Sequence, residues 1–170
     1  MAFTAQDVKK LREMTNVGMM DCKKALTETD GDMDKAVDWL REKGLAKAAK
    51  KADRVAAEGV AYAAVIDGCG VVIEVNSETD FAAKTDAFMD LVKKLAQIVA
   101  EQNPADVEAL KACKYPGTDL TVTEVMQEKV MSIGENMQIR RFARFPENTS
   151  VAYVHAGGTH GVLVNLAVEG

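Results

Sequence analysis

The sequence predicts an α+β protein, in which a small helical bundle precedes an antiparallel sheet packed with helices. Two periodicities support this prediction. In residues 1–45 apolar side chains recur every three or four positions, as in helices, whereas from Gly59 they first alternate as in strands. A chain of 170 residues, 48% of them hydrophobic, can bury one or two modest cores.

Residues 1–45 are expected to form three short helices. Thr4 and Asp7 have the spacing of a capping box at the start of the first helix. The second helix has its own apolar stripe. The third is expected to begin after Asp32, a favourable N-cap residue, and to end at Gly44.

Residues 46–58 are interpreted as a helical linker, because they are rich in alanine and lysine but contain almost no large apolar residue. A first core module is expected in residues 59–149. It opens with VAYAAVID and VVIEVN, two strand-like runs on either side of a glycine turn. Such a pattern is typical of a β-hairpin.

Three helices and one strand follow in this module. A long amphipathic helix ends before Pro104, and a short helical piece covers residues 105–112. Thr121 and Glu124 have the spacing of a capping box for another helix. The alternation in MQIRRFARF, residues 137–145, then predicts a partly exposed strand.

An internal repeat is indicated near the end of the chain. Residues 60–76, VAYAAVIDGCGVVIEVN, align without a gap on residues 151–167, VAYVHAGGTHGVLVNLA. The alternative is a coincidence between two hairpins of similar β-propensity. With a repeat, residues 150–170 begin a second, incomplete core repeat. We then expect the chain to be truncated from a longer protein, or a partner to bury the uncovered sheet face.

Composition narrows the classes of function. The net charge of −5 argues against a nucleic-acid partner, which would require phosphate contacts. No apolar stretch is long enough to span a bilayer, so a cytoplasmic protein is expected. The cysteines are far apart, the two histidines lack further donors, and enzyme signatures are absent. No metal, cofactor or disulfide is therefore expected.

The position of Phe81 in NSETDFAAK permits two interpretations. It lies seven residues before Phe88, so one continuous helix would place it in the core. However, Thr85 and Asp86 supply a second N-cap signal. If the long helix begins only there, Phe81 is free to project from a separate turn. Helical phase alone favours the core interpretation.

Three residues near the first two helices are candidates for contact with a partner. Met20 falls on a lysine-bearing face that should be exposed, and Met19 lies at the edge of the buried stripe. A flexible thioether suits adaptive contacts, although Met20 packing on the linker helix is the alternative. Arg12 borders the core stripe, where a surface salt bridge is equally compatible with the sequence.

Two long stretches resemble the signature motifs of the translation elongation factor Ts family. They are LREMTNVGMMDCKKAL, residues 11–26, and IEVNSETDFAAK, residues 73–84. GENMQIRRF, residues 134–142, resembles a further stretch, and the resemblance covers nearly all of the chain. Members of the family are guanine-nucleotide exchange factors for elongation factor Tu, and bacterial members usually continue through a second core module.

The resemblance implies roles for the candidate residues. Residues 1–45 would be a ubiquitin-associated-like domain that docks on the GTPase through Arg12, Met19 and Met20. Thr79, Asp80 and Phe81 would act as a wedge near the Mg²⁺ and phosphate site of the partner. His155 matches a family histidine at the partner surface. Exchange of this kind requires no covalent catalysis, no cofactor and no direct nucleotide binding by the chain.

Two alternative functions come from other classes. One is a ubiquitin-associated-like adaptor without exchange activity, which would need Met19 and Met20 but not Phe81. The other is an enzyme that uses Glu78 and Asp80 as paired carboxylates. Two acids two positions apart in a loop are weak support for an enzyme, and no other titratable cluster strengthens it.

Overall fold

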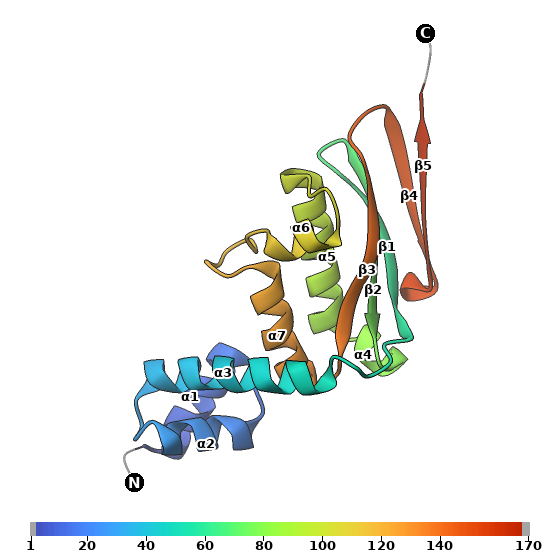
Figure 1. Ribbon diagram of the computed structural model, residues 1–170. Coiled ribbons are helices and arrows are strands. Elements are labelled where there is room, and N and C mark those ends of the chain that lie inside the picture. Colours follow the sequence, from blue (N-terminus) through green and yellow to red (C-terminus); the bar gives the residue numbers. More distant parts are fainter. Residues whose placement is uncertain (1–2, 168–170) are drawn as a thin grey trace. The chain divides into compact units, whose positions relative to one another are not determined.

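The structure is a computed structural model that describes residues 3–167. It confirms the α+β class, with helices and two antiparallel sheets (Figure 1). The described residues up to Asp53 form one compact unit together with Gln127–Gly134, and the rest, from Arg54, form a second. No helix within residues 3–167 is both long enough and apolar enough to cross a bilayer.

The first unit is a helical bundle built from α1 (Ala5–Thr15), α2 (Met19–Glu28), α3 (Met33–Lys51) and the end of α7 (Val122–Ile133). The predicted capping box is present at the start of α1. Side chains from all three N-terminal helices meet in a small core. Its fully buried members are Leu11, Cys22, Ala25, Leu26 and Ala36.

The prediction that the third helix ends at Gly44 is wrong, because α3 continues to Lys51. Gly44 is buried and lies next to α7 within the first unit. A Cβ added at this position would be 3.4 Å from the Met131 sulfur. The glycine therefore provides a close contact with another helix instead of a helix end, and regular helix extends into the stretch interpreted as a linker.

The second unit is built on a sheet with the strand order β1-β2-β3. These strands are β1 (Glu58–Ile66), β2 (Cys69–Ser77) and β3 (Met137–Phe145), so the predicted hairpin and the later strand are confirmed. The hairpin turn consists of Asp67 and Gly68, both with positive φ, as in the two-residue turns that match strand twist.

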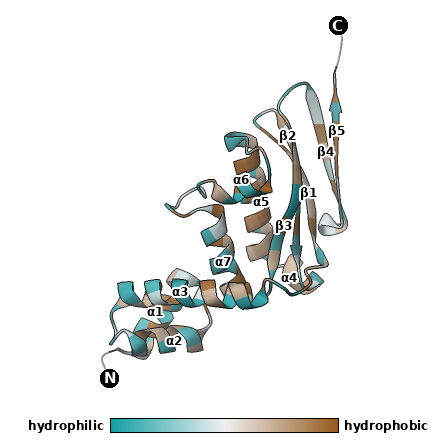
Figure 2. Ribbon diagram, viewed as in Figure 1, coloured by the Kyte–Doolittle hydropathy of each residue, from teal (hydrophilic) through white to brown (hydrophobic). Residues whose placement is uncertain are grey.

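Helix α5 (Asp86–Gln102) covers one face of this sheet, and the apolar residues that meet there are brown in Figure 2. Phe88, Leu91 and Leu95 of α5 are fully buried, as are Val71, Ile73 and Val75 of β2. The predicted short helix is α6 (Val107–Ala112), and the capping box of Thr121 and Glu124 is formed at the start of α7.

A second hairpin, β4 (Thr149–His155) and β5 (His160–Leu166), packs on the face of the sheet away from α5 (Figure 1). Its strands are joined through a 3₁₀ turn, η1 (Ala156–Gly158). Gly70 and Gly161, which are equivalent in the repeat alignment, both lie at the contact. A Cβ on Gly70 would be 2.4 Å from Ser150 Oγ, and one on Gly161 would be 2.6 Å from the Ala61 carbonyl oxygen.

The outer face of this second hairpin is apolar and exposed. Its large side chains are between 47% and 60% exposed, and they are Val151, Tyr153, Val162, Val164 and Leu166. The corresponding β2 positions of the first hairpin, Val71, Ile73 and Val75, are at most 1% exposed beneath α5. The reciprocal glycines support the internal repeat, and the domain division at residues 45, 58 and 149 remains a prediction.

Candidate functional site

The segment with Phe81 is a separate short turn, α4 (Asp80–Ala83), and not the first part of α5. The Thr79 hydroxyl oxygen accepts a hydrogen bond from the Ala82 amide at 3.3 Å. Thr85 then caps α5 by accepting one from the Phe88 amide, also at 3.3 Å. Because the Thr85 backbone is extended between the two helices, the second N-cap signal is confirmed and the continuous helix is wrong.

Phe81 projects into solvent from this turn. Its side chain is 80% exposed, whereas Phe88, one heptad later, is fully buried. The core interpretation of Phe81, which helical phase favoured, is therefore wrong. Burying an aromatic ring of this size against another molecule would stabilise a complex by about 1.5–3 kcal/mol.

Asp80, beside Phe81, forms an ion pair with Lys84 across one helical turn, with 2.6 Å between carboxylate oxygen and Nζ. The hydrogen bond from Lys84 lowers the pKa of Asp80 below its ordinary value. Both side chains remain largely in water, so the pair orients the carboxylate and contributes little to stability.

The turn follows β2, and it is held by contacts with the residues that precede β3, the neighbouring strand. The Thr79 amide and hydroxyl donate to the two carboxylate oxygens of Glu135, at 2.9 and 2.6 Å. In the opposite direction, the Asn136 amide donates to the Glu78 carboxylate at 2.7 Å. Periodicity and motif spacing do not mark Glu135 as a site residue. The only available signal was its position in GENMQIRRF, the stretch with a family resemblance.

The candidate docking residues Arg12, Met19 and Met20 lie in the first unit, on α1 and α2. Met20 is 76% exposed, so the alternative of Met20 packed on a neighbouring helix is wrong. Met19 is 44% exposed and Met14, in the last turns of α1, is 55% exposed. Arg12 is exposed and forms no salt bridge with any residue in the described range, which argues against the surface-pair alternative.

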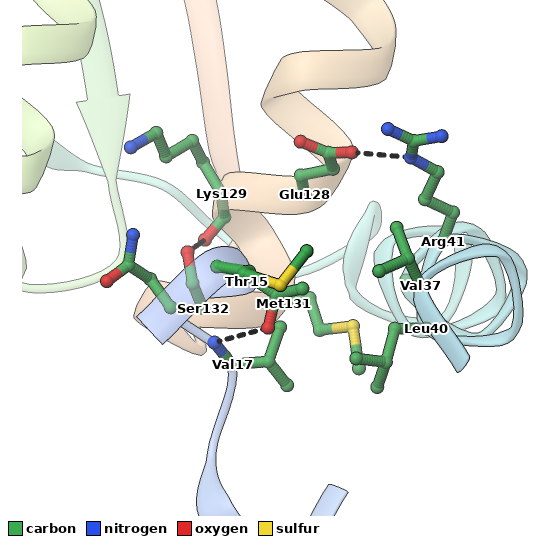
Figure 3. Close-up of a pocket in the computed structure, with 12 residues that line it drawn as sticks. Thr15, Val17, Val37, Leu40, Arg41, Glu128, Lys129, Met131 and Ser132 are labelled. Carbon is green, nitrogen blue, oxygen red and sulfur yellow. Dashed lines mark hydrogen bonds and ion pairs between the residues drawn. The ribbon is translucent and has the colours of Figure 1, made fainter. Parts of the chain in front are cut away.

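The first unit also contains a cavity of about 210 Å³ between the end of α1, α3 and the end of α7 (Figure 3). Val17, Leu40 and Met131 line it, and the ion pair of Arg41 with Glu128, 3.1 Å, lies at its rim. None of the predicted site residues lines this cavity, and its volume is below that of most ligand sites. It gives no support to small-molecule binding.

His155 is exposed at the end of β4, in the same unit as the Phe81 turn. Its Nδ1 lies 2.9 Å from the Tyr153 hydroxyl, and its ring centroid is 6.0 Å from that of His160, its partner across the hairpin. Residues 3–167 contain no group of three side chains suited to hold a metal ion. The pair is a polar end to the apolar outer face of the hairpin.

The geometry offers no support for the acid–base alternative. The Glu78 carboxylate accepts from the Asn136 amide, and the Asp80 carboxylate accepts from Lys84, so each serves a structural contact. Burial raises the pKa of the Cys22 thiol, which disfavours the reactive thiolate. The large exposed apolar side chains of the Phe81 turn and of α2 carry no catalytic arrangement within the described range.

Comparison with known proteins agrees with the resemblance in the sequence. A family model described as Elongation factor TS matches residues 78–170. The elongation factor Ts of Cereibacter sphaeroides is 56% identical over 100% of this chain and 57% of its own length. The one from Trichlorobacter lovleyi is 52% identical over 99% of this chain and 56% of its own length. The chain thus spans little more than half the length of these relatives.

Proposed function

The chain belongs to the elongation factor Ts family, and from this premise we propose that it promotes GDP release from elongation factor Tu. In this proposal the three-residue wedge, Thr79, Asp80 and Phe81, enters the GTPase near its Mg²⁺ and phosphate site. Translation elongation in the cytoplasm is then the process that the chain serves. The 80% exposure of Phe81 is the observation on which the proposal chiefly rests.

Thermodynamic linkage explains how such a wedge can act. A GTPase holds GDP through backbone amides around the phosphates and through Mg²⁺, which neutralises phosphate charge. If the chain binds better to a GTPase whose nucleotide site is distorted, it weakens GDP binding by the same factor. Each tenfold weakening needs about 1.4 kcal/mol of differential binding. One buried ring can supply one to two such steps, and no covalent chemistry is involved.

Docking is assigned to the helical bundle of the first unit. Met19 and Met20 begin α2 with exposed thioethers, and Arg12 presents a free guanidinium among the described residues. Methionine side chains adapt to a partner surface, and arginine is favoured at protein interfaces. His155, exposed in the second unit, would add a further contact with the same partner.

Stopped-flow release of fluorescent GDP from elongation factor Tu tests the wedge directly. Phe81→Ala should reduce the acceleration of release at least tenfold, since it removes the ring that the complex would bury, while leaving the melting temperature of the chain within about 2 °C. Val55→Ala is the matched control, because Val55 is also 80% exposed but lies outside the turn. It should behave as the unmodified chain does.

The same measurement separates exchange from simple recruitment. An adaptor would bind the GTPase through Met19 and Met20 without changing the rate of GDP release, and Phe81→Ala would then have no kinetic effect. Unchanged release rates with the unmodified chain bound would contradict the proposed function. A large loss of thermal stability in Phe81→Ala would show that the ring supports the fold.

A further inference from the structure

We propose that Glu135 is a positioning residue for exchange, which holds the Phe81 turn in the orientation that the wedge requires. The inference rests on the proposed function of Phe81. Glu135 acts through Thr79, and its two contacts with that residue define the geometry.

Both carboxylate oxygens of Glu135 are used by Thr79. The Thr79 amide donates to Oε2 at 2.9 Å, and the Thr79 hydroxyl donates to Oε1 at 2.6 Å. Hydrogen bonds to an ionised acceptor are shorter and stronger than those between neutral groups. One side chain therefore fixes both the backbone and the hydroxyl of the residue that begins the turn.

The direction of the Thr79 hydroxyl proton links Glu135 to the helical cap. A hydroxyl has one proton to donate and lone pairs to accept. Thr79 donates its proton to Glu135, and the same oxygen accepts from the Ala82 amide at 3.3 Å. Glu135 therefore orients the same side chain that caps α4, and Phe81 lies between Thr79 and Ala82, the two residues joined by this cap.

The anchoring extends to the sheet. Ser77, the last residue of β2, pairs with Met137, the first residue of β3, so the segments beyond these residues leave the sheet side by side. In return, the Glu78 carboxylate accepts from the Asn136 amide at 2.7 Å, so each of the two segments supplies a carboxylate to the other. Asn136 is only 5% exposed, so its end of the hydrogen bond with Glu78 is shielded from water.

A turn held in this way is pre-organised for insertion. A loose turn would have to be ordered when Phe81 enters the partner, and the cost would be subtracted from the differential binding that weakens GDP. Without Glu135 the turn keeps another contact, the hydrogen bond of 2.9 Å from the Ser77 hydroxyl to the Thr79 carbonyl oxygen. The fold should therefore survive while the orientation of Phe81 becomes less restricted.

Glu135→Gln is the direct test in the 170-residue chain. Glutamine has similar size but only one acceptor oxygen, and its amide nitrogen cannot accept from Thr79. The maximal rate of fluorescent-GDP release from elongation factor Tu should fall about tenfold, while the half-saturating concentration of the chain changes less than about twofold. By nuclear magnetic resonance, hydrogen exchange at the Thr79 amide should speed up about tenfold.

Glu74→Gln is the matched control. Glu74 is a half-buried carboxylate of the same unit that pairs with Arg141, 2.7 Å away, and has no hydrogen bond or ion pair with the turn in the described range. It should leave the maximal rate and the Thr79 exchange unchanged. Glu135→Asp, with the charge kept but one methylene removed, should give a rate between those of the unmodified chain and Glu135→Gln.

The outcomes distinguish the two proposals. If the unmodified chain accelerates GDP release and Glu135→Gln reaches the same maximal rate, the positioning role is wrong while the wedge stands. A parallel loss of rate and of more than about 5 °C in melting temperature would assign Glu135 to stability and also overturn the inference. If the unmodified chain does not accelerate release, the proposed function fails and the positioning role fails with it.

Discussion

Phe81 and Phe88 show how surroundings decide the use of the same residue type. They lie one heptad apart, yet one is 80% exposed and the other is fully buried. Phe88 contributes to the core between α5 and the sheet, where truncation of an aromatic ring typically costs about 3–5 kcal/mol. Phe81 contributes almost nothing to folding, so its ring remains available for contact with another molecule.

The lowered pKa of Asp80 can be tested by titration. Its pKa is lowered chiefly by the hydrogen bond from Lys84, so Lys84→Met should return it towards the ordinary value of 3.8. A depressed folded-state pKa stabilises the fold above the unfolded pKa, and this stabilisation is lost as pH falls through the folded value. Titration of the carboxyl carbon by nuclear magnetic resonance checks the midpoint. An unchanged midpoint in Lys84→Met would show that the ion pair does not form in solution.

Among the elements, α3 departs most from the sequence-based expectation. A glycine after an amphipathic stripe usually indicates a helix end, because it adopts the left-handed conformation without strain. In α3 the residues that follow Gly44 are leucine, alanine and lysine, which favour helix and carry the segment on to Lys51. Gly44 faces α7 within the first unit, where an added Cβ would be 3.4 Å from the Met131 sulfur, about the van der Waals distance, so an alanine can fit there.

Gly44→Ala should therefore stabilise the protein. Alanine favours helix over glycine by about 0.8–1 kcal/mol, and the added Cβ would meet the Met131 sulfur at 3.4 Å, at the end of a flexible side chain. The expected gain is about 0.5–1 kcal/mol in the free energy of unfolding, measured with urea. A loss of stability would mean that α7 cannot yield by the few tenths of an ångström required.

The two hairpins have similar sequences but different surroundings. The first is covered by α5. Gly70 of the first hairpin and Gly161 of the second are equivalent in the repeat alignment, and both allow the hairpins to pack closely. The outer face of the second hairpin carries five large apolar side chains about half exposed. The family relatives, nearly twice as long as this chain, share this part of the sequence.

The same substitution at equivalent positions of the two hairpins measures this difference in burial. Val71 and Val162 are equivalent in the repeat alignment, but Val71 is fully buried and Val162 is 48% exposed. Val71→Thr should cost about 1–3 kcal/mol because it buries a hydroxyl among apolar neighbours, whereas Val162→Thr should change stability by less than about 0.5 kcal/mol. Urea unfolding of both variants provides the comparison. Equal costs would indicate that the outer face is covered in solution.

The amino-acid sequence by itself determined most of the elements, because caps, turns and periodicity are local signals, and its motif stretches carried the family resemblance. Thr4, Thr85 and Thr121 mark helix starts, alternation marks the strands, and the exposed position of Met20 follows from its helical face. Only the tertiary structure decided the exposure of Phe81 and the contact of Glu135 with Thr79. Helical phase cannot distinguish one helix from two, and Thr79 meets a carboxylate 56 residues away only because β2 and β3 pair. Contacts of that range depend on the whole folded chain, and no local pattern encodes them.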